Sequence, residues 1–253
     1  MRVAKKKAYI FIFIFFLITI QGSYQYFHEN QKQRSTMNVG GRQNNINNIQ
    51  NNINNINLPQ TAKGDTITYL QEKYQNEDIK ATITIDNDNF TYPVVQTIDN
   101  DYYLTHDYAK NKDALGSIYA DYRINLDTSR KILIFGHSST IRETPFNELE
   151  KYYDESFFQK HRMITLETKN NTYHYEIFSV HIETTDFTYM NLNFESSLKW
   201  YAHIRKLQER SWYHTEVELK SDDDILILQT CSNHPKYKNN KSKYLLIVSR
   251  RVK

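Results

Sequence analysis

Two residues of this chain carry side chains suited to covalent catalysis, and each follows a strongly apolar segment. The run 225–230 (ILILQT) leads into Cys231, and the run 131–136 (KILIFG) leads into His137. Short apolar runs of this kind are consistent with buried strands. A strand end is a rigid support that can hold a thiol and an imidazole within reach. The pair predicts a cysteine nucleophile with a histidine acid/base, although sequence spacing does not show that the two meet.

Both residues also have a purely structural interpretation. Cys231 is the only cysteine, so an intramolecular disulfide is excluded, and the residue is either a reactive thiol or a buried, inert one. His137 is one of nine histidines and could be an ordinary turn residue. Without a cysteine pair or a closely spaced histidine pair, the sequence predicts no metal site and no cofactor.

The composition is that of a folded domain with additional segments. The 253 residues are 39% hydrophobic and 14% aromatic, with only 6 Gly and 4 Pro, which argues against a collagen-like or generally disordered chain. Lys and Arg number 32 and Asp and Glu 29, for a net charge of +3. This near balance gives no reason to expect nucleic acid as a partner.

The N-terminal region predicts a membrane anchor. Residues 1–7 form a basic cytoplasmic tail, and residues 8–27 begin with the apolar run AYIFIFIFFLITI and end in aromatics that suit the membrane interface. The basic flank predicts a single-pass protein of the cell membrane with its catalytic domain extracellular. A cleaved signal peptide stays open, because the apolar core is short for a span. No convincing small-x-small cleavage site follows, which favours a retained anchor.

A polar spacer and one globular domain follow the anchor. Residues 28–65 include the asparagine-rich stretch 43–57 (QNNINNIQNNINNIN), in which isoleucines recur at helical spacing. Asparagine is a poor helix former, so a disordered spacer is the better interpretation than a short helix. Residues 66–253 have the composition of a globular domain, and we expect them to form the catalytic domain.

Within this domain the pattern is mainly β. Segments rich in β-branched and aromatic residues alternate with polar turns, as expected of a sheet closed into a barrel. The predicted strands are 81–85, 92–97, 131–135, 163–167, 172–183, 216–219, 225–229 and 244–249, and the predicted helices are 66–74, 146–158 and 195–210. In the last helix, Trp200, Tyr201, Ile204 and Leu207 share one face, which we interpret as core.

The segment around Cys231 resembles a known family. Residues 228–231 (LQTC) resemble the TLxTC signature of sortases, with Ile227 in place of the first Thr. Further blocks in the same order and spacing resemble class B sortases: 92–96 (YPVVQ), 101–106 (DYYLTH), 116–123 (GSIYADYR), 135–137 (FGH), and 185–186 (TD) with the Tyr189 region and the helix after it. The resemblance covers roughly residues 66–250.

The resemblance implies a fold and an activity. The fold would be a closed eight-stranded β-barrel with an N-terminal helix and a long helix-bearing loop before the Cys231 strand. The activity would be that of a cysteine transpeptidase that cleaves an Asn-Pro-x-Thr-x sorting signal after Thr and transfers it to a peptidoglycan cross-bridge amine or a lipid-linked precursor. Residues implied to line or border the peptide groove are Leu104, Thr185, Tyr189, Met190, Gln229 and Thr230.

One position departs from the family pattern. Sortases carry an arginine at the start of the last strand, where it can stabilise the developing oxyanion, and this chain has Lys243 there. Lysine supplies charge without the bidentate guanidinium fork. Arg250 and Arg251 lie at the far end of that strand and could take the arginine's role only if the strand register is misread. Lys243 could also be merely one of several solvated lysines in its loop.

Two other functions stay open. A papain-like cysteine peptidase is disfavoured, because in that fold the cysteine begins a helix and precedes its histidine. An anchored β-barrel binding module with weak or no activity is favoured by the lysine at position 243.

Overall fold

The computed structural model describes residues 65–88 and 90–252. The predicted cytoplasmic tail and anchor, and the spacer up to residue 64, therefore lie outside the described residues, while Asp65, the last residue of the predicted spacer, begins a helix. Among the residues that are described, no helix is long and apolar enough to cross a membrane.

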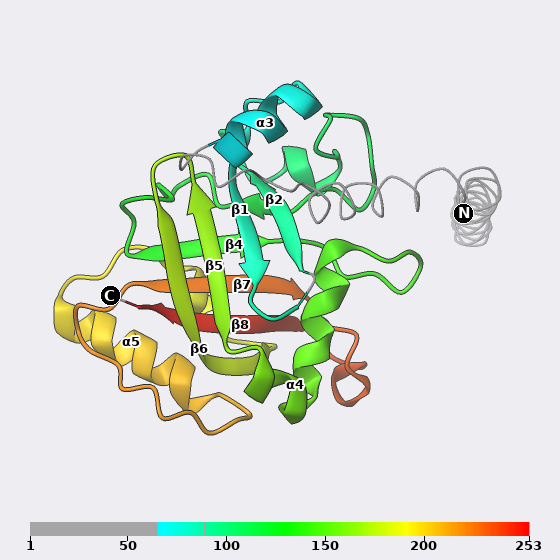
Figure 1. Ribbon diagram of the computed structural model, residues 1–253. Helices are drawn as coiled ribbons and strands as arrows, with labels where there is room; N and C mark the ends of the chain where they lie inside the picture. The colour runs from blue at the N-terminus through cyan, green and yellow to red at the C-terminus, as the bar shows by residue number, and fades with distance from the viewer. Residues whose placement is uncertain (1–64, 89, 253) are drawn as a thin grey trace, which may run out of the picture. The chain divides into compact units, whose positions relative to one another are not determined.

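The strands close into one eight-stranded barrel in the order β1-β2-β3-β4-β7-β8-β6-β5 (Figure 1). Their bounds are β1 Ile79–Ile85, β2 Thr91–Val95, β3 Tyr119–Ala120, β4 Lys131–Phe135, β5 Met163–Thr168, β6 Thr172–Glu183, β7 Ile225–Cys231 and β8 Tyr244–Arg251. Two neighbouring pairs are parallel, β2 with β3 and β4 with β7, and the others are antiparallel. The predicted closed, mainly β barrel is confirmed.

The two longest helices lie at the positions in the chain that the sequence predicted. The helix α3 (Asp65–Tyr74) precedes β1, and α5 (Ser197–Glu209) lies in the connection between β6 and β7. Short elements complete the domain: η1 Tyr102–Leu104, η2 Pro145–Tyr153, α4 Glu155–Lys160, η3 Phe187–Met190 and η4 Pro235–Tyr237. The N-terminal helix and the helix-bearing loop before the Cys231 strand are both present.

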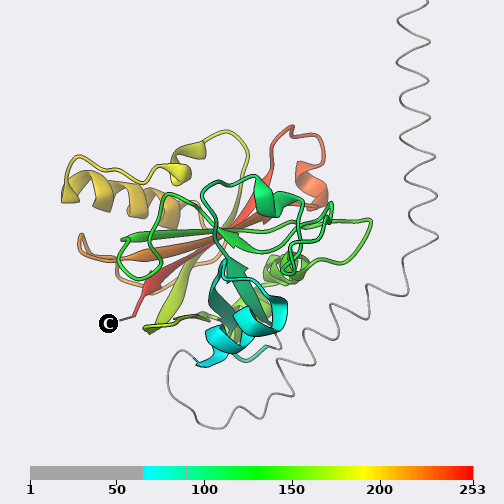
Figure 2. The same cartoon turned by 90° about the horizontal axis from the view of Figure 1, so that it is seen from above.

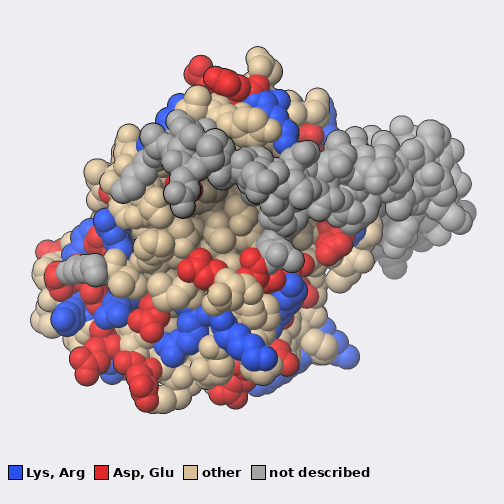
Figure 3. All heavy atoms as spheres, viewed as in Figure 1, with Lys and Arg blue, Asp and Glu red and all other residues tan. Residues whose placement is uncertain are grey.

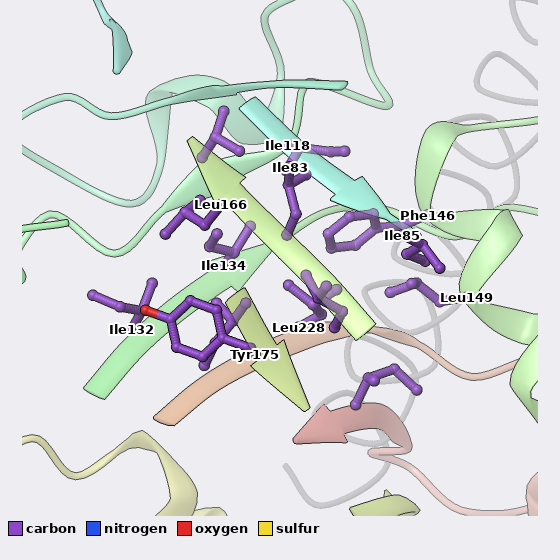
Figure 4. Close-up of a cluster of buried hydrophobic side chains, with 14 of the residues drawn as sticks. Ile83, Ile85, Ile118, Ile132, Ile134, Phe146, Leu149, Leu166, Tyr175 and Leu228 are labelled. Atoms are coloured by element: carbon purple, nitrogen blue, oxygen red, sulfur yellow. The ribbon is translucent and has the colours of Figure 1, made fainter. Parts of the chain in front are cut away.

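Strands β4 and β7 are apolar on both faces. Ile132, Ile134 and Leu228 point into the barrel core, where Figure 4 shows them among other aliphatic and aromatic side chains. Leu133 and Ile227 alternate with these residues and therefore face outward, yet both are fully buried. Burial on both faces explains the continuous apolar runs in the sequence.

One strand of the structure was not predicted, and two predicted elements differ from the structure. Strand β3 has only two residues, too few to give a periodic signal. The predicted strand 216–219 is wrong: its backbone carbonyls at Val217 and Glu218 accept bonds from the Gln208 and Arg250 side chains instead of joining a ladder.

The predicted single helix 146–158 is divided into η2 and α4. Asp154 separates the two with an extended backbone, and its carboxylate accepts hydrogen bonds from the amides of Ser156 and Phe157. A residue that caps a new helix in this way also ends the preceding one.

On the face seen in Figure 3, Lys and Arg side chains are intermixed with Asp and Glu. On this face the basic side chains do not form a single stripe or patch of the kind that binds the phosphate backbone of a nucleic acid.

The residue before His137 leaves no room for a side chain. A Cβ added to Gly136 would lie 2.7 Å from the ring of Phe146, which is fully buried in the core. We predict that Gly136→Ala lowers the free energy of unfolding by about 1–3 kcal/mol, because overpacking outweighs the entropy that alanine removes from the unfolded chain. Urea denaturation measures this change. Phe146→Leu in the same chain should recover part of the loss, and an unchanged midpoint for Gly136→Ala would contradict the account.

Candidate active site

The parallel pairing of β4 with β7 brings Cys231 and His137 to one rim of the barrel. Phe135 lies opposite Gln229, and the Gly136 amide donates to the Gln229 carbonyl at 3.2 Å. His137 is two residues beyond Phe135, and Cys231 is two residues beyond Gln229 and ends β7. Neighbouring strands lie about 4.8 Å apart. The thiol and the imidazole therefore extend from adjacent backbone positions.

The imidazole of His137 is oriented by a backbone carbonyl. Its Nε2 lies 3.1 Å from the carbonyl oxygen of Leu104, the last residue of η1, and the side chain is half-buried. A carbonyl oxygen only accepts hydrogen bonds, so Nε2 donates, and in the neutral ring Nδ1 carries the free lone pair. Leu104, which was predicted to line the peptide groove, thus contacts His137 through its backbone.

The thiol of Cys231 is exposed at the end of β7. Partial burial raises its pKa above the ordinary value, and the positive charge of Lys243 opposes that rise with a smaller effect. An exposed thiol whose pKa is raised is mostly protonated at neutral pH. Attack by this sulfur therefore requires a base or a bound substrate that favours the thiolate.

Lys243 lies at the same rim as Cys231. The next residue, Tyr244, begins β8 and pairs with Cys231. The carbonyl oxygen of Lys243 itself accepts a hydrogen bond from the Ser232 amide at 2.9 Å. The Lys243 ammonium donates to the carbonyl oxygen of Lys238 at 3.3 Å. The structure therefore places a lysine at the Cys231 rim, within electrostatic reach of the thiol.

The two C-terminal arginines lie at the opposite end of β8. Arg250 pairs with Ile225 in the ladder and its guanidinium contacts Glu176 at 3.2 Å, while Arg251 contacts Asp224 at 3.4 Å. Six to seven residues of strand separate them from Tyr244, which corresponds to roughly 20 Å. Neither can reach the Cys231 rim in this register.

Two predicted groove residues are joined to each other. Tyr189 of η3 is buried and its hydroxyl donates to Oε1 of Gln229 at 2.8 Å. Gln229 is two residues before Cys231 and faces outward on the same side of β7. This bond fixes the η3 turn beside the strand that carries the thiol.

The other predicted groove residues are placed differently. Thr185 is exposed just before η3, with its amide bonded to Glu183 Oε1 at 2.9 Å, and Met190 offers its carbonyl to Arg123 at 3.4 Å. Thr230 is buried, and its Oγ1 has no hydrogen-bond partner within the described residues. Its side chain alternates with that of Gln229 and so faces the barrel interior, which argues against direct side-chain contact with a peptide in the groove.

A hydrogen-bond cluster that the sequence did not reveal joins the loops behind the two reactive residues. Ser138 Oγ donates to Glu150 Oε1 at 2.7 Å, and Asn233 Nδ2 donates to the same carboxylate oxygen at 2.7 Å. Ser138 follows His137, and Asn233 comes two residues after Cys231. Their separation in sequence leaves no local pattern by which this cluster could be found.

In the part of the chain that the structure describes, no group of three or more His, Cys, Asp or Glu side chains is arranged to hold a metal ion. The chemistry available at this rim is that of a thiol, an imidazole and an ammonium group.

A family model described as Sortase domain matches residues 83–251. The chain belongs to the sortase family. This membership excludes the papain-like alternative, in agreement with a cysteine that ends a strand and follows its histidine in the chain.

The relatives of this sortase belong to class B. It is 33% identical to Sortase B of Listeria monocytogenes over 167 residues, which are 66% of this chain and 68% of that protein. It is 29% identical to Sortase B of Staphylococcus aureus over 159 residues, or 62% and 65% of the two chains. A crystal structure of sortase B from Bacillus anthracis in complex with AAEK1 is 30% identical, with a TM-score of 0.66 over 77% of this chain and 89% of that chain. The protein is therefore a class B sortase, a cysteine transpeptidase.

The electrostatic link between Lys243 and the thiol can be measured. We predict that the rate of Cys231 alkylation by iodoacetamide, measured against pH, gives an apparent thiol pKa higher than that of an ordinary thiol. The ordinary value is about 8.5. Lys243→Gln should raise this pKa further, because it removes the charge that favours the thiolate. Lys241→Gln, an exposed lysine of the same loop, is the matched control and should leave the profile unchanged. A profile that does not respond to Lys243→Gln would contradict the link.

Proposed function

We propose that this sortase cleaves an Asn-Pro-x-Thr-x sorting signal after Thr and transfers the Thr acyl group to a cell-wall amine. The observation that carries the proposal is the convergence of Cys231, His137 and Lys243 on one barrel rim. The blocks that resemble class B sortases support the choice of signal. A peptidoglycan cross-bridge amine, or its lipid-linked precursor, would be the acceptor.

The first half of the reaction is acylation. The Cys231 thiolate attacks the Thr carbonyl carbon, a C–S bond forms, and the negative charge moves to the carbonyl oxygen. The C–N bond then breaks, and protonated His137 gives its proton to the leaving amine. In the second half the acceptor amine attacks the thioester, neutral His137 takes its proton, and the sulfur leaves as thiolate. In this scheme Nδ1 is the nitrogen that exchanges the proton, because Nε2 is engaged with the Leu104 carbonyl.

Lys243 would stabilise the oxyanion in this scheme. A cation aimed at the charge that develops on the carbonyl oxygen lowers the barrier more than it favours the ground state. An ammonium group is a compact point charge and makes no bidentate contact. We therefore expect Lys243 to contribute less geometric selection of the substrate carbonyl than an arginine would.

Hydrogen bonds and ion pairs fix the turn after β6 that would contact the peptide. Glu183 is buried and its Oε1 accepts bonds from the amides of Thr184, Thr185 and Asp186. Arg210, just after α5, bridges Glu183 and Asp186. Burial opposes ionisation of Glu183, but the three amides and Arg210 hold the pKa of its carboxyl below the ordinary value. Lys206, Thr188 and Arg210 do the same for Asp186. A fixed turn keeps Thr185 and Tyr189 in place before the peptide arrives, which reduces the entropy lost on binding.

The location of the protein follows from the same proposal. An anchor at residues 8–27 with a cytoplasmic tail would hold residues 66–253 outside the cell membrane, where sorting signals and the cell-wall acceptor meet. The spacer 28–65 would set the distance between the bilayer and the barrel.

The proposed activity has a direct test. We predict that the full-length chain in detergent cleaves a quenched fluorescent Asn-Pro-x-Thr-x peptide between Thr and the last residue. Cys231→Ala should abolish cleavage, because no other thiol exists in the chain. His137→Ala should lower kcat/KM by at least about 10²-fold. Cleavage that survives Cys231→Ala would overturn the mechanism.

The binding-module alternative rests on the lysine at position 243. If the wild type binds but does not cleave several sorting peptides in the presence of several amines, that alternative is favoured. We predict instead that Lys243→Arg retains activity and that Lys243→Ala lowers kcat by roughly 10²-fold, the usual cost of one oxyanion contact. Steady-state kinetics separate the outcomes. Equal kcat values for wild type and Lys243→Ala would place Lys243 outside the reaction.

A further inference from the structure

A second site lies at the other end of β4. Figure 2 shows α5 beside the N-terminal ends of β4 and β7, while the β7–β8 connection with η4 lies at their far ends. Between the start of β4 and the loop that leads into α5 is a pocket of about 380 Å³. Lys131, the first residue of β4, lines it, and six residues of chain, roughly 20 Å, separate Lys131 from His137.

The pocket is lined by three basic residues. Arg123, Arg130 and Lys131 line it, and none of its lining residues is acidic. Asp121 pairs with Arg123 at 2.7 Å, and Asp224 lies 3.5 Å from the Nε of Arg130, so each arginine has an acidic neighbour outside the pocket lining. The positive charge of Lys131 has no such neighbour among the groups that bond to it.

Lys131 is buried without an anionic partner. Its side chain is 2% exposed, and its ammonium contacts the Asn191 carbonyl oxygen and His203 Nε2, each at 2.9 Å. Both contacts are to neutral acceptors, since burial and the Lys131 charge lower the pKa of His203 to about 3. A buried charge without a counter-ion is costly, and proteins usually pair it. An amine in this position is therefore suited to an anion that enters the pocket.

The rest of the pocket lining is largely aromatic and aliphatic, and two of its rings lie against the cations: Arg130 over Trp200 at 4.9 Å and the Lys131 ammonium over Phe194 at 5.6 Å. Phe194 and Trp200 pack edge to face, with ring centroids 5.0 Å apart, and both line the cavity. The Trp200 indole also donates to the Asp223 carbonyl oxygen at 3.0 Å, which fixes its ring. Ser196 lines the pocket where α5 begins and caps that helix. The wall therefore selects an occupant with an apolar body as well as a negative group.

We propose that this pocket binds a small organic acid, with its carboxylate at Lys131 between Arg123 and Arg130 and its aromatic or aliphatic body against Phe194 and Trp200. Two sources of this chemistry are a free acid and the C-terminal carboxylate of a peptide. The site is distinct from the catalytic site, because none of its lining residues belongs to the Cys231 rim.

Binding should be coupled to proton uptake. Burial, together with Arg123, lowers the pKa of Lys131 to about 7, so the amine is largely neutral at pH 8. A carboxylate at the amine stabilises its charged form and raises this pKa, so binding at pH 8 takes up a proton and is weaker at pH 9 than at pH 6. The groups near the amine are Arg123, with its partner Asp121, and His203, and these three keep one protonation state across this range.

The test is calorimetry of the full-length chain in neutral detergent. Phenylacetate is the free-acid probe, N-acetylphenylalanine is the peptide-terminus probe, and phenylacetamide is the neutral control. At pH 8, titrations in two buffers of different ionisation enthalpy measure the protons taken up. We expect at least one acid to bind with uptake of up to one proton, and phenylacetamide to bind at least about tenfold more weakly.

Matched variants locate the site. Lys131→Met should abolish the proton uptake and weaken binding at pH 6 by at least about tenfold, whereas Lys241→Met, at an exposed lysine, should change neither. Arg130→Gln tests the pocket mouth without disturbing the buried amine and should weaken binding in the same direction. The proposal is overturned if neither acid binds below about 10 mM, if phenylacetamide binds equally well, or if Arg130→Gln and Lys131→Met both bind as the wild type does.

Discussion

Hydrogen bonds between β4 and β7 join two strands that are far apart in the chain and make their ends coincide. In a parallel pair both strands run in the same direction, so the residues that follow each strand emerge at the same rim. Phe135 opposite Gln229 sets the register that places His137 beside Cys231. The fixed geometry that cysteine chemistry requires therefore comes from the barrel itself, and the loops adjust orientation through contacts such as that of His137 with the Leu104 carbonyl.

The same two strands are buried on both faces, and this explains why long connections cover the outside of the barrel. The segment from η3 to α5 runs along the outer face: Tyr189 bonds to Gln229 near the reactive rim, and Asn191 bonds to Lys131 at the other end of β4. One connection thereby shapes both the predicted peptide groove and the cationic pocket. Both proposed binding places therefore lie along the outer face of β4 and β7, beside this one connection.

The sequence revealed the parts of the fold that have a period or a sharp change of character. The bounds of β4 and β6 agree with the apolar and β-branched runs, and α3 and α5 are found within one or two residues of their predicted ends. Strand β3 is too short for a pattern, and 216–219 has a strand-like alternation without a ladder partner. Cys231 and His137 became candidates because Cys231 ends an apolar strand, His137 follows another by two residues, and the surrounding blocks resemble class B sortases. The link from Ser138 through Glu150 to Asn233, and the pocket at Lys131, depend on contacts between segments that only the folded chain brings together.

The central claim is that Cys231, positioned beside His137, forms a thioester with the Thr of a sorting signal. Intact-mass spectrometry of the full-length chain, quenched with acid during turnover of an Asn-Pro-x-Thr-x peptide, measures this most directly. The account predicts an adduct with the mass of the acyl fragment ending in Thr, carried by the fragment that contains Cys231 and released by hydroxylamine. Peptide cleavage without any such adduct, or an adduct on another residue, would contradict it.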